Sequence, residues 1–262
     1  MLPASRGSAD SVRRVYCTIV ERSMMAKRSA SAPMIFILYI ALVILAHIPL
    51  LILRIIMRWH GKEVPGMPGT GGELAEYLVE RSGIDAKVLR GKEHEDRYEP
   101  GCRTIYLSPS VYDGRSLAAV AVAAHEFGHA LQHHEKHPAM AARQQYYRLV
   151  QVVEGIAVTL LGLAPIVGIF LRSAALTLVL VLAAIVLFFS RLVMHILTLP
   201  LEWDASFGKA LPIIQAGRLV APGEERAVRR VLRAAAFTYV ANALADVLSI
   251  WRWLLILRRG LL

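Results

Sequence analysis

The chain has 262 residues, of which 56% are hydrophobic, and its formal net charge is +10. The apolar residues gather in long stretches, which indicates an integral membrane protein and excludes an ordinary soluble globular protein. Lys and Arg gather near lipid headgroups in membrane proteins, and no base-reading module is visible, so the charge does not indicate nucleic-acid binding. Cys17 and Cys102 are too few for a disulfide framework or a cysteine-based zinc site.

Residues 1–33 are polar, rich in Arg and Ser, and lack an apolar period. We expect a disordered basic tail. The alternatives are a targeting presequence and an over-long start, with the true initiator at Met24 or Met25. Residues 34–53 carry no formal charge, so 34–57 is predicted to be a transmembrane anchor, which is retained because no cleavage site follows it.

Residues 58–148 have the composition of a soluble domain, and we predict a small α+β, zincin-like catalytic domain there. Thr70 and Glu73 form a capping box for a helix that stops near Gly83. Short strands are predicted at Lys87–Arg90 and Thr104–Leu107, with a charged loop between them. A strand so close to the following helix either holds an extended peptide substrate by main-chain pairing or pairs only within the domain.

The following helix, predicted over residues 116–132, contains the pattern His-Glu-x-x-His. His125 and His129 lie four residues apart on one helix face, so both imidazoles can reach one zinc ion. Glu126 is the predicted general base, placed to hold the water that zinc activates and to shuttle its proton. Gly128 is unfavourable inside a helix and predicts close approach of another element. The alternative is two surface histidines on an ordinary helix. His133, one turn further on, is predicted to be a solvated surface residue.

The apolar stretch 155–190 is interrupted only by Arg172. As one helix it would be about 54 Å long, against a hydrocarbon core of about 30 Å, so 149–190 is predicted to be a transmembrane hairpin. The hairpin returns the segment 191–233 to the side of the motif helix. There, Glu202 completes a His, His, Glu set that leaves a fourth zinc position for water. Alternatively, Pro200 opens a new helix there and Glu202 only stabilises its N-terminus.

Residues 234–262 are predicted to hold a fourth transmembrane helix and the C-terminus, although a helix lying over the catalytic domain is the alternative. Asn242 and Asp246 share one face of this helix and are expected to face the bundle. Tyr239, near its start, is a candidate to donate a hydrogen bond to a developing oxyanion. The predicted architecture is therefore a mainly α membrane protein with about four transmembrane helices and a small α+β catalytic domain.

Several sequence segments between residues 34 and 257 occur in the same order as in the YugP-type membrane-bound neutral zinc metallopeptidases, and the chain resembles that family. They are 104–108 with 111–124, 125–132, 199–206 and 235–241. The resemblance implies a gluzincin-like membrane peptidase, distantly like the HtpX and CAAX-protease group, in which His125, His129 and Glu202 bind one Zn²⁺ and Glu126 is the catalytic base. Many gluzincins have an Asp four residues after the ligand Glu, which orients a ligand His. This chain has Ser206 there and Asp204 two residues earlier, so either is a candidate for that role.

We therefore expect a zinc metalloendopeptidase in the lipid bilayer of a prokaryotic plasma membrane, acting on membrane or membrane-adjacent proteins. Glu202 follows Arg191, the expected membrane exit, by 11 residues, or about 16 Å of helix, so the site should lie close above the lipid. The alternatives are a non-catalytic membrane protein with a structural or regulatory zinc site, and a transporter that depends on Asp246. Basic residues flank both sides of the predicted spans, so the sequence does not assign the active site to a membrane face. It does not assign an oligomeric state either.

Overall fold

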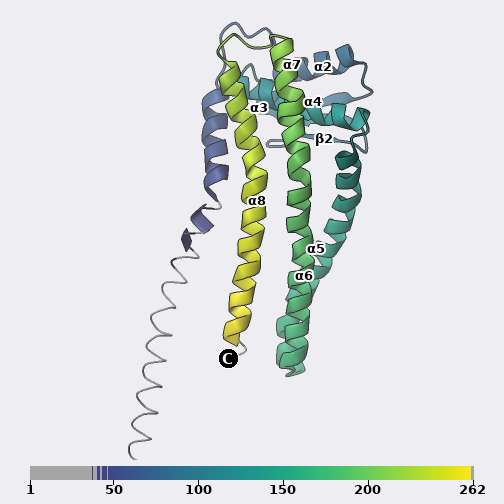
Figure 1. Ribbon diagram of the computed structural model, residues 1–262, viewed down its shortest axis with the longest axis vertical. Helices are drawn as coiled ribbons and strands as arrows, with labels where there is room; N and C mark the ends of the chain where they lie inside the picture. The colour runs from purple at the N-terminus through teal and green to yellow at the C-terminus, as the bar shows by residue number, and fades with distance from the viewer. Residues whose placement is uncertain (1–36, 38–39, 42, 46, 261–262) are drawn as a thin grey trace, which may run out of the picture. The chain divides into compact units, whose positions relative to one another are not determined.

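The computed structural model describes residues 37, 40–41, 43–45 and 47–260, so the tail expected at 1–33 lies outside the described residues. The chain divides into two units, 1–45 and 46–262, and the second carries the sheet and the helices α2 to α8. This unit consists of a small α+β head on long helices (Figure 1). In the described part, four helices are long and apolar enough to cross a membrane: Val43–His60, Pro138–Gly168, Ala175–Ala216 and Glu225–Leu248. The predicted fold class is confirmed.

The head begins with α2 (Gly71–Ser82), which has the predicted capping box. The Glu73 amide donates to Thr70 Oγ1 (3.2 Å), and the Thr70 amide donates to Glu73 Oε2 (2.7 Å). Gly83 ends the helix in the left-handed conformation, at φ 63°, which glycine adopts without a steric penalty.

The sheet has three strands in the order β1-β3-β2. As predicted, β1 (Lys87–Arg90) and β3 (Thr104–Leu107) are strands, and they pair in parallel. The prediction of a loop between them was wrong for three residues, because β2 (Arg97–Glu99) pairs antiparallel with β3. The alternation of so short a segment is too weak to identify a strand, and the backbone bonds to β3 decide it. β2 is therefore an edge strand of this sheet.

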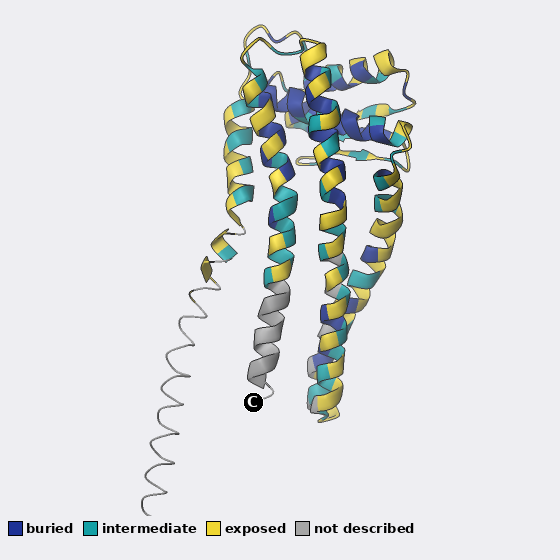
Figure 2. Ribbon diagram, viewed as in Figure 1, coloured by how far each residue is buried: buried dark blue, intermediate teal, exposed yellow. Residues whose placement is uncertain are grey.

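The short helix α3 (Pro109–Tyr112) leads to α4 (Leu117–His134), which runs through the middle of the head. Many residues of α4 are alanines, whose small side chains let neighbouring elements approach closely. One core cluster packs α4 against the sheet and α2, around Ile105, Leu107 and Phe127. A second cluster packs its other side against α7 and α8, around Ile214 and Leu232. Figure 2 shows the buried residues concentrated in this region.

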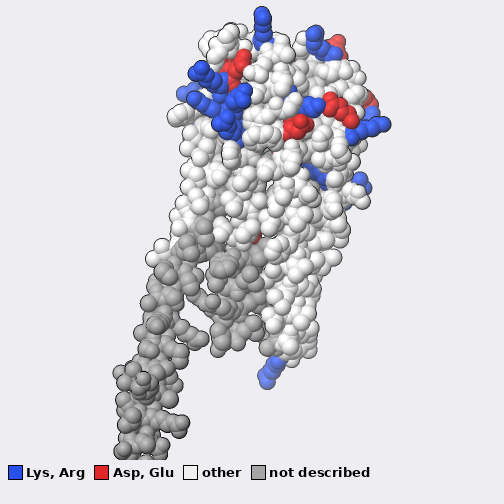
Figure 3. All heavy atoms as spheres, viewed as in Figure 1, with Lys and Arg blue, Asp and Glu red and all other residues white. Residues whose placement is uncertain are grey.

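α5 (Pro138–Phe170) and α6 (Ala174–Trp203) lie side by side as a helical hairpin, which extends beyond the predicted range 149–190 at both ends (Figure 1). The chain reverses at Arg172, which has a left-handed backbone conformation at φ 47°. Exposed apolar side chains such as Val179, Val186 and Phe189 cover α6. Figure 3 shows Lys and Arg gathered on the head, above a nearly uncharged surface on the long helices.

One alternative from the sequence was that Pro200 opens a new helix. Instead, Pro200 lies inside α6. A proline removes one backbone hydrogen bond, and the remaining bonds and the packing of α6 keep the helix continuous. The change in helical geometry comes later, at η1 (Asp204–Ala210), a π-helical segment followed by α7 (Leu211–Ala216). π-helical turns are rare and occur often at functional sites.

The last helix, α8 (Glu225–Gly260), combines the two alternatives considered for this segment. Its first turns pack on the head, where Val228, Val231 and Leu232 are buried in the second core cluster. The same helix runs beside α6, and the candidate membrane span Glu225–Leu248 includes these first turns.

Candidate metal site

The three predicted zinc ligands converge on one point. Glu202 Oε2 lies 3.2 Å from His125 Nε2 and 3.1 Å from His129 Nε2. A tetrahedral zinc ion with ligand bonds of 2.0–2.1 Å separates its ligand atoms by roughly 3.3 Å. Glu202 is only 1% exposed, and the two imidazole rings meet edge to face with centroids 4.7 Å apart. Two nitrogens and one carboxylate oxygen form a catalytic type of zinc donor set, so these residues fit the ion.

Gly128 allows the end of α6 to reach this position. A Cβ atom on Gly128 would lie 2.8 Å from the backbone oxygen of Ala205, in η1. The close approach predicted from the glycine is therefore present, and the approaching element is the segment that follows Glu202. Because this contact lies between the two histidines in sequence, it brings Glu202 against the motif helix.

Gln132 links His129 to the segment after Glu202. Its Oε1 lies 2.9 Å from His129 Nδ1, and its Nε2 donates to Asp204 Oδ2 (2.8 Å) and to the Leu201 carbonyl (2.9 Å). The two donated bonds fix the Gln132 amide so that its oxygen faces His129. This oxygen accepts the proton on Nδ1 of His129, which leaves Nε2 free for a metal. Sequence reasoning did not assign Gln132 a role, although its position three residues after His129 on the same helix was a usable signal.

Ser206 orients His125, the other histidine, in a similar way. Its hydroxyl lies 3.1 Å from His125 Nδ1, which leaves His125 Nε2 facing Glu202. The sequence left open whether Asp204 or Ser206 orients a ligand histidine. The structure brings both to the site: Ser206 contacts His125 directly, and Asp204 acts on His129 through Gln132.

Arg143 of α5 was missed by sequence reasoning. Its Nη1 donates to Glu202 Oε1 over 2.9 Å, so one carboxylate oxygen binds the guanidinium while the other faces the two imidazoles. This bond compensates part of the cost of burying the Glu202 charge. No local pattern marks Arg143, because its partner lies 59 residues away and only the packing of α5 against α6 brings them together.

Glu126 is buried beside these groups, between the two histidines in sequence. Burial raises the pKa of its carboxyl to about 7, and the negative charges of Glu202 and Asp96 act in the same direction. The nearby His125 and Arg143 oppose this rise. A carboxyl with a pKa near neutrality can both accept and donate a proton at physiological pH.

Tyr239, the oxyanion-stabilising candidate, also reaches the site. Its hydroxyl group lies close to Glu202. His133 and Asp246 do not join the cluster. His133 Nδ1 lies 2.8 Å from the Tyr98 hydroxyl, and Asp246 Oδ2 lies 3.3 Å from His195 Nε2 on α6.

Comparison with known proteins agrees with this geometry. A family model described as "Putative neutral zinc metallopeptidase" matches residues 34–258. The chain is also 37% identical over 195 residues to a protein of Bacillus subtilis (strain 168) described as "Putative membrane protease YugP". That similarity covers 73% of this chain and 82% of the Bacillus protein. No solved structure matches the chain.

Proposed function

Because the chain belongs to this family of neutral zinc metallopeptidases, we propose that it is a zinc-dependent endopeptidase that hydrolyses peptide bonds of membrane or membrane-adjacent proteins. The observation that carries the proposal is the approach of Glu202 Oε2 to within 3.2 Å of the Nε2 atoms of both His125 and His129, with Glu126 buried beside them. A merely structural metal site has no use for a buried carboxyl such as Glu126 next to the ligands.

In this proposal His125, His129 and Glu202 hold one zinc ion. Zinc would supply the Lewis acidity that makes a water molecule nucleophilic at neutral pH and polarises the substrate carbonyl. The hydrogen bonds that the Nδ1 atoms of His129 and His125 donate to Gln132 and Ser206 hold each imidazole with its Nε2 atom toward the ion.

Glu126 carries the proton in this mechanism. Its carboxylate accepts a proton from the attacking water and then donates it to the amine that leaves when the peptide bond breaks. Burial raises the pKa of this carboxyl above its usual value in the metal-free protein, which favours a group that takes up a proton and gives it back. Tyr239 would donate a hydrogen bond to the oxyanion that develops on the carbonyl oxygen, which makes it a transition-state contact.

The position of the site supports a substrate in or near the membrane. Glu202 lies in the last turn of α6, a helix whose outer surface is covered by exposed apolar side chains. Glu202 also lies within Ala175–Ala216, the candidate membrane span that includes α6. Substrate segments that emerge from the lipid beside α6 would therefore reach the site over a short distance.

The test is the Glu126→Gln variant of the full chain, purified in detergent with zinc. We expect the variant to keep its zinc and its thermal stability while peptide hydrolysis falls by about 10²–10⁴-fold. Glu80→Gln, an exposed carboxylate on α2, is the matched control and should hydrolyse peptides at the wild-type rate. Hydrolysis by Glu126→Gln at the wild-type rate would refute the mechanism. A wild-type protein that binds zinc without cleaving any protein or peptide would favour the alternative, a structural or regulatory zinc site.

A further inference from the structure

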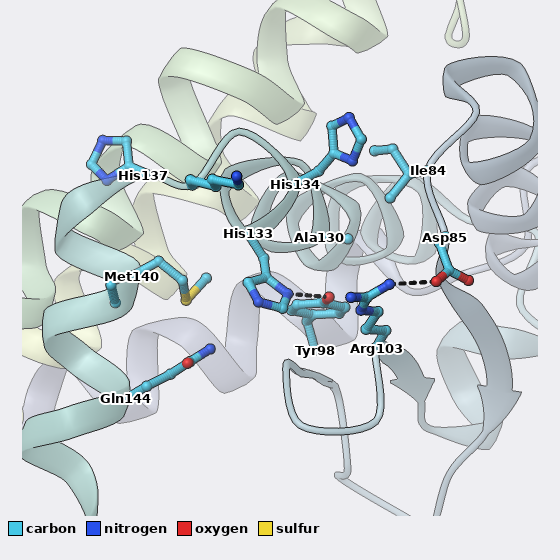
Figure 4. Close-up of a pocket in the computed structure, with 12 residues that line it drawn as sticks. Ile84, Asp85, Tyr98, Arg103, Ala130, His133, His134, His137, Met140 and Gln144 are labelled. Carbon is cyan, nitrogen blue, oxygen red and sulfur yellow. Dashed lines mark hydrogen bonds and ion pairs between the residues drawn. The ribbon is translucent and has the colours of Figure 1, made fainter.

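A pocket with a volume of about 470 Å³ lies between β2, the end of α4 and the start of α5. Its apolar part is formed by Ile84, Ala130 and Met140. Figure 4 shows the side chains of its polar part, which the proposed chemistry does not use. Besides His133, His134 and His137, they are Asp85, Tyr98, Arg103, Lys136 and Gln144.

The pocket adjoins the candidate metal site through two elements. On α4, His133 follows His129 by one helical turn, a rise of about 6 Å, which corresponds to about two residues of an extended peptide. On α5, Gln144 directly follows Arg143, the residue that binds Glu202. The edge strand β2 supplies Tyr98 to the same wall. A peptide that occupies the site and continues along α4 therefore passes this pocket.

Gln144 offers an unused hydrogen-bond donor. Its Nε2 atom is buried and has no hydrogen-bond partner among the described residues. Figure 4 shows the amide pointing toward the side of the pocket where His133 and Tyr98 lie. A buried donor without an acceptor costs free energy, which a ligand oxygen at this position would recover.

The charges around the pocket favour an anion. Asp85, which is the only carboxylate among the lining residues, already pairs with Arg103. Lys136 has no ion pair in the part of the chain that the structure describes. The pocket thus combines an unpaired ammonium group with an unsatisfied amide donor, and charge-assisted hydrogen bonds to a carboxylate are the strongest that such groups make.

We propose that this pocket binds a carboxylate of the peptide substrate, about two residues from the scissile bond. The carboxylate belongs either to an acidic side chain or to the C-terminus of the substrate. This inference rests on the proposed peptidase function and adds a specificity-determining role for Lys136 and Gln144.

The experiment uses the full chain in detergent with zinc. Cleavage sites are first mapped with a proteome-derived peptide mixture, and one cleaved sequence is then synthesised with Glu or Gln at each of the four positions on either side of the scissile bond. Each peptide is made with a free and with an amidated C-terminus. The readout is the ratio of kcat/KM values for the Glu and Gln peptides at each position, and for the free and amidated forms of each peptide. It is measured for the wild type and for Lys136→Glu, Lys136→Met, Gln144→Leu and Lys87→Glu. Lys87 is an exposed cation on β1 that does not line the pocket.

We expect the wild type to prefer the carboxylate by about tenfold at one position about two residues from the scissile bond, or at a free C-terminus that reaches the pocket. Lys136→Met and Gln144→Leu should lower this ratio, Lys136→Glu should invert it, and Lys87→Glu should leave it unchanged. The two peptide series distinguish a side-chain from a C-terminal carboxylate. A wild-type ratio near one throughout, or equal ratios in Lys136→Glu and Lys87→Glu, would overturn the inference while leaving the peptidase function intact. If the wild type cleaves no peptide, the proposed function itself fails.

Discussion

Gln132 and Asp204 are joined by a 2.8 Å hydrogen bond although 72 residues separate them in the chain. The same Gln132 side chain contacts His129, so the segment after Glu202 and the motif helix control one imidazole together. Gln132 is fully buried, which leaves no water to replace these bonds if the amide is removed.

We therefore predict that Gln132→Leu weakens zinc binding. Residues that orient a metal-bound histidine typically contribute about 10–100-fold in affinity, so a loss in this range is expected. Competition with a chelator in detergent measures it. Gln145→Leu, which changes an exposed amide on α5, should leave zinc affinity unaltered. Equal affinities for Gln132→Leu and Gln145→Leu would show that His129 needs no such orientation.

Gly128→Ala should disturb the contact between α4 and η1. Alanine is better than glycine in a helix by about 1 kcal/mol, but its Cβ would lie 2.8 Å from the Ala205 oxygen, and overpacking of this kind costs about 1–3 kcal/mol. We expect lower thermal stability and lower zinc retention. Gly155→Ala in α5 is the control, because nothing lies within 4 Å of its added Cβ, and it should not lower stability. A Gly128→Ala protein as stable as Gly155→Ala would contradict the close packing of these segments.

Arg143→Met should impair the metal site without touching any proposed ligand. The substitution leaves the buried Glu202 Oε1 without its partner, and removing one member of a buried ion pair costs about 3–5 kcal/mol. Bound zinc recovers part of that cost, so the stability of the metal-free protein should fall more than that of the zinc-loaded protein. Thermal unfolding with zinc and with chelator measures both. Arg148→Met, an exposed arginine on α5, should change neither. An unchanged metal-free stability in Arg143→Met would argue against the pair.

Asp246→Asn tests whether Asp246 has a direct functional role, as the transporter alternative requires. Asp246 lies 3.3 Å from His195, which links α8 to α6 seven residues before Glu202. We expect the substitution to reduce the stability of the protein, because the attraction between two partly buried groups is lost. Peptide hydrolysis per bound zinc should remain at the wild-type value. Complete loss of hydrolysis with full zinc content and unchanged thermal stability would instead give Asp246 a direct functional role.

Local patterns in the sequence determined a large part of this protein. The spacing of His125 and His129 places both on one face of α4, and the capping box and Gly83 set the ends of α2, because these effects act within one or two helical turns. The length of the apolar stretch around Arg172 required a hairpin, since one straight helix would exceed the membrane. From that hairpin alone, Glu202 could be expected on the side of the motif helix.

Only the tertiary structure decided which side chains complete the site. Arg143 and Glu202 lie 59 residues apart, and Gln132 and Asp204 lie 72 apart, so no helical or strand period connects them. The strand β2 was not predictable either, because it is defined by its pairing with β3, a separate segment of the chain. The position of Pro200 inside a helix likewise depends on the packing of α6. Local periodicity specifies which face of an element is buried, but it does not specify which residue of another element lies opposite, because that depends on how all the elements pack together.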